Sequence, residues 1–177
     1  MRIEERARYA ATLEKVLAFK FLDALERDWI LEHSEIIKAD DGESIIEEGE
    51  VSPYLYAVLE GSANVLVHRD EKEIYICMIG AGEIVGEAGL FMNVKRTANV
   101  VACGETIVLR LKRDAFLEFL TRQPRGGSRM LLVIIYGLLK KLRDANQELA
   151  FERNADIGQD DIDDMVANML LGSDPLP

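Results

Sequence analysis

The sequence predicts a mainly β protein with flanking helices, in which an eight-stranded antiparallel β jelly roll is followed by a long dimerisation helix. Three observations support this prediction. Residues 3–37 have helical apolar spacing, residues 36–112 carry short apolar runs between turn residues, and helical spacing returns after Lys112. Closely spaced strands with Asp-Gly and Glu-Gly turns are typical of an antiparallel sandwich or barrel. The expected segments are 1–35, 36–125, 126–154 and 155–177.

Residues 1–35 are expected to form two or three short helices, because their apolar residues recur among charged ones and no glycine or proline occurs before Gly42. The first residues, MRIEERARYAATLEK, lack the continuous apolar run of a signal peptide. The longest uncharged apolar run, residues 130–139, is ten residues long and too short to span a bilayer. The sequence therefore predicts a cytoplasmic protein that does not enter a membrane.

Residues 36–125 are expected to hold the jelly-roll core. About eight strands are predicted from apolar runs, the clearest at 36–37, 45–46, 54–59, 65–67, 74–79, 98–102 and 106–111. Cys77 and Cys103 fall within such runs, so we expect reduced core residues rather than a disulfide. Two cysteines with two histidines make a poor zinc set, and we expect neither a metal nor a cofactor.

The long helix is predicted from about Ser128 to Asn154, after a helix over 113–122 that Pro124 and Gly126-Gly127 would stop. Its apolar residues recur at alternating steps of four and three, a heptad seam: Leu131, Ile135, Leu138, Leu142, Ala145 and Leu149. A second apolar face holds Met130, Val133, Ile134 and Gly137. We expect one face to lie on the β core and the other on the same helix of a second copy, in a parallel homodimer. Alternatively, one monomer buries both faces.

The charge of the chain argues against DNA as a partner. Net charge is −11, and seven acids against one base lie from Glu152 onward. DNA-binding surfaces need clustered lysine and arginine. The chain offers only residues 122–129 and a helix face with Lys140, Lys141 and Arg143. We interpret both as solvated helix surface.

Two motifs stand out in the β region. Gly86-Glu87-Ala88-Gly89-Leu90 is followed, after five residues, by Arg96-Thr97-Ala98. Upstream, Glu48-Gly49-Glu50 precedes the run LYAVLEG at residues 55–61. In this order and spacing they resemble the phosphate-binding cassette, and the segment before it, of cyclic-nucleotide-binding domains. That family includes catabolite activator protein and the protein kinase A regulatory subunit, and the resemblance covers roughly residues 13–150.

The resemblance implies a site for cAMP or cGMP, a ligand with one negative charge and one free ribose hydroxyl. Exposed amides at a helix N-terminus suit the anion, and the two cassette glycines let the backbone approach it. Arg96 would present its fork to the phosphate oxygens, Thr97 would add a hydroxyl, and Glu87 would accept the ribose 2′-OH. Alternatively, Glu87 is an exposed turn acid and Arg96 a surface residue in a salt bridge. The expected ligand residues are Gly86, Glu87, Ala88, Gly89, Arg96, Thr97, Ala98 and Arg143.

Two features depart from the family pattern. Lys95 stands where many relatives have proline. In many relatives the long helix supplies polar residues that reach the purine, and here Leu142 and Arg143 would hold those positions. Only Arg143 could stack on or bond a base. Thr97 fits cGMP-binding members as well as bacterial-type cAMP sites, and we expect cAMP rather than cGMP.

The signal is expected to reach a protein rather than DNA. Relatives of the catabolite-activator type place a helix-turn-helix domain after the long helix, whereas here a short acidic tail follows, so we expect a stand-alone sensor of bacterial type. The tail has an amphipathic helical pattern, with apolar residues at Ile162, Met165, Val166, Met169 and Leu170. Residues 159–163 are similar to a flagellar switch peptide that binds receiver domains, so a receiver-like partner is expected. Alternatively, the tail packs on its own dimer or binds no partner.

Three classes of function are compatible with these features. The first is a cyclic-nucleotide sensor that transmits ligand state through the dimer helix and the tail. The second is a dimeric scaffold of the same fold that binds no ligand. The third, an enzyme on a cupin-like barrel, needs clustered metal ligands, whereas His33 and His68 are isolated in the sequence. We therefore do not expect an enzyme.

Overall fold

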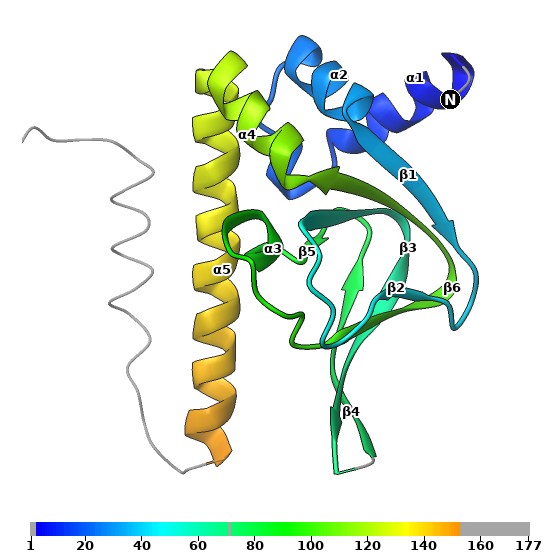
Figure 1. Ribbon diagram of the computed structural model, residues 1–177, viewed down its shortest axis with the longest axis vertical. Coiled ribbons are helices and arrows are strands. Elements are labelled where there is room, and N and C mark those ends of the chain that lie inside the picture. Colours follow the sequence, from blue (N-terminus) through cyan, green and yellow to red (C-terminus); the bar gives the residue numbers. More distant parts are fainter. Residues whose placement is uncertain (1–2, 71, 153–177) are drawn as a thin grey trace, which may run out of the picture. The chain divides into compact units, whose positions relative to one another are not determined.

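The computed structural model describes residues 3–70 and 72–152 (Figure 1). The chain divides into two compact units, Met1–Ile135 and Tyr136–Pro177. Among the described residues, the first unit holds every strand and the start of helix α5 (Pro124–Glu152), and the second continues that helix to Glu152. The residues predicted for partner binding in the tail, from Ile162 to Leu170, lie outside the described residues.

The N-terminal segment forms short helices, as its spacing predicts. They are α1 (Ile3–Leu13), a single 3₁₀ turn at Leu17–Phe19, and α2 (Ala24–Glu32). The start of α2 follows from a capping box. The side chain of Asp23 accepts the backbone N–H of Glu26, and the side chain of Glu26 accepts the backbone N–H of Asp23.

All strands of the described residues pair antiparallel in one sheet. Four of them lie side by side in the order β1, β6, β3, β4, with bounds Ser34–Ala39, Asn99–Lys112, Tyr54–Arg69 and Lys72–Gly80. Two short strands complete the sheet: β2 (Ser44–Ile46) pairs with β6, and β5 (Ile84–Val85) pairs with β3. The mainly antiparallel β fold with flanking helices is therefore confirmed.

The described residues contain six strands rather than the eight or so predicted, because two pairs of predicted strands are continuous, and one of the six, β5, falls outside the predicted runs. The runs at 54–59 and 65–67 both belong to β3, and those at 98–102 and 106–111 both belong to β6. The interruptions are bends within a continuing ladder. The β3–β6 register shifts on both sides of Glu60, and Gly61 and Gly104 have positive φ angles of 81° and 73°. Gly61 and Gly104 therefore lie within strands, where the sequence predicts turns between strands.

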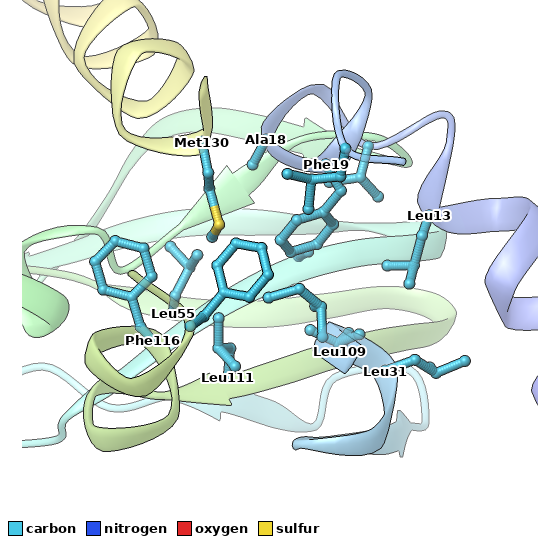
Figure 2. Close-up of a cluster of buried hydrophobic side chains, with 14 of the residues drawn as sticks. Leu13, Ala18, Phe19, Leu31, Leu55, Leu109, Leu111, Phe116 and Met130 are labelled. Atoms are coloured by element: carbon cyan, nitrogen blue, oxygen red, sulfur yellow. The ribbon is translucent and has the colours of Figure 1, made fainter. Parts of the chain in front are cut away.

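The sheet buries apolar side chains on both of its faces. Along β3, Leu55, Ala57 and Leu59 join the cluster that packs under the helices (Figure 2), whereas Tyr56 and Val58 join a cluster on the opposite face. This explains why residues 54–59 form a continuous apolar run without alternation. The helix-side cluster also contains large side chains from four helical segments: Phe19, Ile30, Phe116, Phe119, Met130 and Ile134.

The prediction that both cysteines are core residues is wrong. Cys77 and Cys103 lie in strands β4 and β6, as expected, but both are exposed. Strand β4 is the last strand of the sheet order, and its residues 72–78 are exposed irrespective of the face they occupy. Cys103 lies beside the bend at Gly104. The apolar runs around these cysteines therefore predicted the strands correctly but did not predict whether the side chains are buried.

Helix α4 (Arg113–Arg122) has its predicted bounds, whereas α5 (Pro124–Glu152) begins four residues before the predicted Ser128. Proline is tolerated in the first turn of a helix. Gly126 and Gly127 lie inside α5. Other helices pack so closely on these two positions that a side chain would not fit. A Cβ on Gly126 would lie 2.5 Å from the Glu26 carboxylate, and one on Gly127 would lie 2.7 Å from Leu120.

Within residues 3–70 and 72–152, none of the helices combines the length and the apolar character that a bilayer span requires.

Candidate ligand-binding site

The motif residues form a compact loop between β5 and β6. Gly86 follows β5 with a positive φ of 81°, a conformation that favours glycine, and the chain then enters α3 (Ala88–Phe91), a single helical turn. After α3 the chain returns past Lys95, which bridges to Val51. The glycines, Glu87 and Arg96 are thereby brought together around one centre.

Arg96 is that centre. Its side chain is buried, with only 8% of the residue exposed. Nη1 donates to the Gly86 carbonyl (2.9 Å), and Nη2 donates to the Tyr54 carbonyl (2.6 Å) and the Ser52 hydroxyl (3.4 Å). The Nε atom is buried and has no hydrogen-bond partner within the described residues. Because a buried N–H without an acceptor costs about 1–3 kcal/mol, the site retains an unused capacity to donate to an acceptor.

Two glycines are required by this guanidinium as well as by the turn. A Cβ on Gly86 would lie 2.9 Å from Nη1 of Arg96. A Cβ on Gly89 would lie 2.8 Å from both Nη atoms and 2.7 Å from the Ser52 carbonyl. Any larger residue would therefore displace either the arginine or the backbone around it. The sequence assigned both glycines to close approach toward a ligand, and the structure adds close approach to the arginine.

Burial and neighbouring side chains act on the Arg96 guanidinium in opposite directions. Burial lowers the pKa of the Arg96 guanidinium, and nearby Tyr56, Glu50 and Glu87 oppose this by favouring the charged form. Glu87 is itself buried, with 6% exposed. The alternatives of an exposed turn acid and a surface arginine are therefore both wrong. The site holds a buried carboxylate close enough to a buried guanidinium to act on its charge.

Of the four remaining predicted ligand residues, three lie in the loop around Arg96 and one lies on α5. Ala88 and Thr97 are exposed and Ala98 is half-buried, on the two arms of the loop that holds Arg96. Arg143 lies in the second compact unit, on α5, where its Nε is 3.8 Å from the Asp144 carboxylate. Its role toward a purine stays a prediction.

Four residues of the site were missed by the sequence analysis. Ser52 and Tyr54 contribute the oxygens that hold Arg96, and the Tyr56 ring centroid lies 6.0 Å from the Arg96 guanidinium carbon. Arg113 donates to carbonyls of α3. Backbone carbonyls carry no residue signature, and an arginine at a strand–helix junction resembles any solvated surface residue. Only Tyr56, in the upstream motif run 55–61, offered a signal.

The site contains groups suited to binding an anion. A guanidinium with a buried spare donor favours an anionic acceptor, and glycines leave room for the backbone to approach it. In the part of the chain that the structure describes, no three His, Cys, Asp or Glu side chains are grouped so as to hold a metal ion.

Residues 36–123 match the family model described as "Cyclic nucleotide-binding domain". The chain is also similar to the cAMP-dependent protein kinase regulatory subunit of Mycosarcoma maydis, with 32% identity over 126 residues. The match covers 71% of this chain and 23% of that protein, so the chain spans about a quarter of the length of this curated relative.

Solved structures with the same fold include a cyclic nucleotide-binding domain from Methylobacillus flagellatus KT. That structure has a TM-score of 0.75 and 22% identity, over 86% of each chain. The regulatory domain of Toxoplasma gondii PKA, crystallised with cAMP, has a TM-score of 0.65 and 29% identity. This match covers 80% of the present chain and 51% of that structure.

Proposed function

Residues 36–123 of this chain belong to the cyclic nucleotide-binding domain family, and we propose that the chain is a regulatory sensor that binds cAMP in preference to cGMP. The observation that carries the proposal is the Arg96 guanidinium, buried against Gly86 and Gly89 with its Nε atom unused. A buried cation with a spare donor is costly to keep unless an anion uses it. The phosphate of a cyclic nucleotide is an anion of suitable size and charge.

Each cassette residue has a distinct task in this proposal. Arg96 donates to the exocyclic phosphate oxygens, and Glu87 accepts the ribose 2′-OH, which distinguishes ribose from deoxyribose. The backbone of Ala88 and Gly89 approaches the phosphate, and the exposed Thr97 hydroxyl adds a donor at the rim. One phosphate oxygen can accept from the unused Nε. Because Nη1 and Nη2 already donate to two backbone carbonyls, a second phosphate oxygen must share or replace one of these bonds.

The preference for cAMP rests on relatives rather than on a contact. The regulatory domain from Toxoplasma gondii was crystallised with cAMP, and the Mycosarcoma maydis relative is described as cAMP-dependent. Thr97 is compatible with either nucleotide. Arg143 is the residue of the long helix that would meet the purine.

The test is a calorimetric titration of the purified chain with cAMP and with cGMP, alongside Arg96→Ala. Saturable binding that Arg96→Ala loses supports the sensor. Arg122→Ala is the matched control, because the Arg122 side chain is 66% exposed and pairs with Glu118 at 2.7 Å on the surface of α4. If neither nucleotide gives heat or thermal stabilisation up to millimolar concentration, the sensor function is refuted.

Dimerisation through α5 is the second part of the proposal. Four residues of the heptad seam, Ile135, Leu138, Leu142 and Leu149, are between 41% and 58% exposed in the single chain. Apolar residues at this spacing favour a coiled coil between two copies. We expect Leu142→Glu to give a monomer in sedimentation experiments and the exposed Gln147→Glu, which adds the same charge outside the seam, to leave the dimer intact. A monomeric wild type refutes the dimer.

The output of the sensor is proposed to be a protein contact rather than DNA. The net charge of −11 disfavours a DNA surface, and the amphipathic pattern from Ile162 to Leu170 suits a groove on a receiver-like domain. Deleting residues 156–177 should abolish capture of such a domain while leaving nucleotide affinity unchanged. Unchanged capture after the deletion refutes the role of the tail.

A non-binding dimeric scaffold is the alternative function. Leu142, at a position where relatives carry a polar residue toward the purine, cannot hydrogen-bond a base and favours this alternative. A failed titration combined with an intact dimer would support it.

A further inference from the structure

Arg113, the first residue of α4, reaches across to the one-turn helix of the cassette. Its Nε donates to the Gly89 carbonyl (3.0 Å), and its Nη2 donates to the carbonyls of Gly89 (2.7 Å) and Met92 (2.6 Å). Its backbone N–H donates to the Pro53 carbonyl (2.8 Å). One half-buried residue therefore contacts both the end of α3 and the segment that leads into β3.

These two segments are the ones that surround Arg96. The carbonyl of Gly89 faces Arg113, while its α-carbon lies so close to the Arg96 guanidinium that no Cβ fits. Pro53 lies between Ser52 and Tyr54, whose oxygens accept from Arg96. Arg113 thus bonds to the same two backbone segments that contact Arg96.

Helix α3 needs such an external contact. It has four residues, and an isolated helix of this length is unstable in water because nucleation costs more than a single turn returns. Its position is therefore determined by what holds its ends. Helix α4 contacts it twice, through Arg113 and through Phe116. The Phe116 and Phe91 rings pack edge-on, with their centroids 6.0 Å apart.

From these contacts we propose that Arg113 is a positioning residue of the ligand site. It holds α3 and the 52–54 segment in the arrangement that aims the Arg96 guanidinium and the Gly89 backbone at the bound phosphate. It also joins this arrangement to α4. The inference rests on the proposed cyclic-nucleotide function, since its consequence for affinity requires that ligand.

The chain contains a built-in reporter for the connection to α4. Trp29 is its only tryptophan. The ring centroid of Trp29, on α2, lies 5.3 Å from the ring centroid of Phe119, on α4. Both α2 and α4 belong to the same compact unit as the cassette. Movement of α4 on binding will therefore change the emission of Trp29.

The experiment compares wild type with Arg113→Ala, Arg113→Lys and the exposed control Arg122→Ala. Affinities for cAMP and cGMP are measured well below the melting temperature of each variant, so that only folded protein is titrated. We expect Arg113→Ala to bind about tenfold more weakly or worse, within the usual range of coupling between sites. Arg113→Lys should recover part of the loss, because an ammonium can reach one carbonyl but lacks the guanidinium fork. Arg122→Ala should bind like wild type.

Two further measurements separate positioning from general stability. Nucleotide-induced change in Trp29 fluorescence should be reduced in Arg113→Ala and retained in Arg122→Ala. Hydrogen exchange of the backbone amides at 86–92, without nucleotide, should accelerate only in Arg113→Ala. A variant with a lowered melting temperature but wild-type affinity, fluorescence change and exchange would overturn the proposal.

Failure of the proposed function has a different signature. A wild type that binds neither nucleotide refutes the sensor and the ligand-positioning role together. In that case the hydrogen-exchange comparison alone decides whether Arg113 holds α3. Protected amides in Arg113→Ala would then overturn the structural part as well.

Discussion

Replacing Gly89 by alanine tests the packing of the site most directly. Gly89 lies in α3 and does not have a positive φ, so alanine is compatible with its backbone. Helix propensity alone predicts a gain of about 1 kcal/mol for this change. The structure predicts the opposite sign, because the new Cβ would lie 2.7 Å from the Ser52 carbonyl and 2.8 Å from both Arg96 Nη atoms.

The magnitude follows from comparison with Gly137→Ala on α5. A Cβ on Gly137 meets no heavy atom within 4 Å, so this variant receives the propensity gain without a clash. Overpacking typically costs about 1–3 kcal/mol. We therefore expect Gly89→Ala to be less stable than Gly137→Ala by about 1–3 kcal/mol in urea denaturation.

The same substitution should weaken ligand binding, because the guanidinium must move away from the new methyl group. Calorimetry with cAMP is expected to give weaker binding for Gly89→Ala and unchanged binding for Gly137→Ala. If Gly89→Ala is as stable as Gly137→Ala and binds nucleotide like wild type, the close approach of Arg96 to α3 is wrong. That result would also contradict the buried position of the Arg96 guanidinium against α3.

Three other expectations concern the scaffold. Phe119→Ala should lower the free energy of unfolding by about 3–5 kcal/mol in urea denaturation, because the side chain is fully buried between helices and sheet. Thr106→Val should cost about 1–3 kcal/mol by the same measurement, since the buried hydroxyl donates to the Ser62 carbonyl at 2.7 Å and valine leaves that acceptor without this donor. The backbone N–H of His68 lowers the pKa of the Glu48 carboxylate below its ordinary value of 4.5. This carboxylate therefore stabilises the fold above pH 4.5, and its contribution is lost as the pH falls through the lowered pKa. Stability measured against pH should fall less on the acid side in Glu48→Gln than in wild type, and an identical acid limb would contradict the assignment.

The order of the elements could be predicted because each kind of element leaves a local pattern. Helical spacing located α1, α2 and α4, and apolar runs located every strand of the described residues except the two-residue β5. The strand count could not be predicted, since a glycine bend inside β3 or β6 looks the same in sequence as a turn between two strands. The prediction of buried cysteines is also wrong. Hydrophobicity along a strand does not show that β4, which carries Cys77, is the last strand of the sheet order, or that Cys103 lies beside the bend at Gly104.

The sequence by itself determined the cassette, since Gly86, Glu87, Gly89 and Arg96 lie within eleven residues and one loop must bring them together. Only the tertiary structure decided what holds that loop. The contact of Arg113 with Gly89 joins residues 24 apart, and the oxygens of Ser52 and Tyr54 meet Arg96 across more than 40 residues. Most of these acceptors are backbone carbonyls, which every residue carries. Which of them meets an arginine is set by how the sheet and helices pack, and residue identity does not record it.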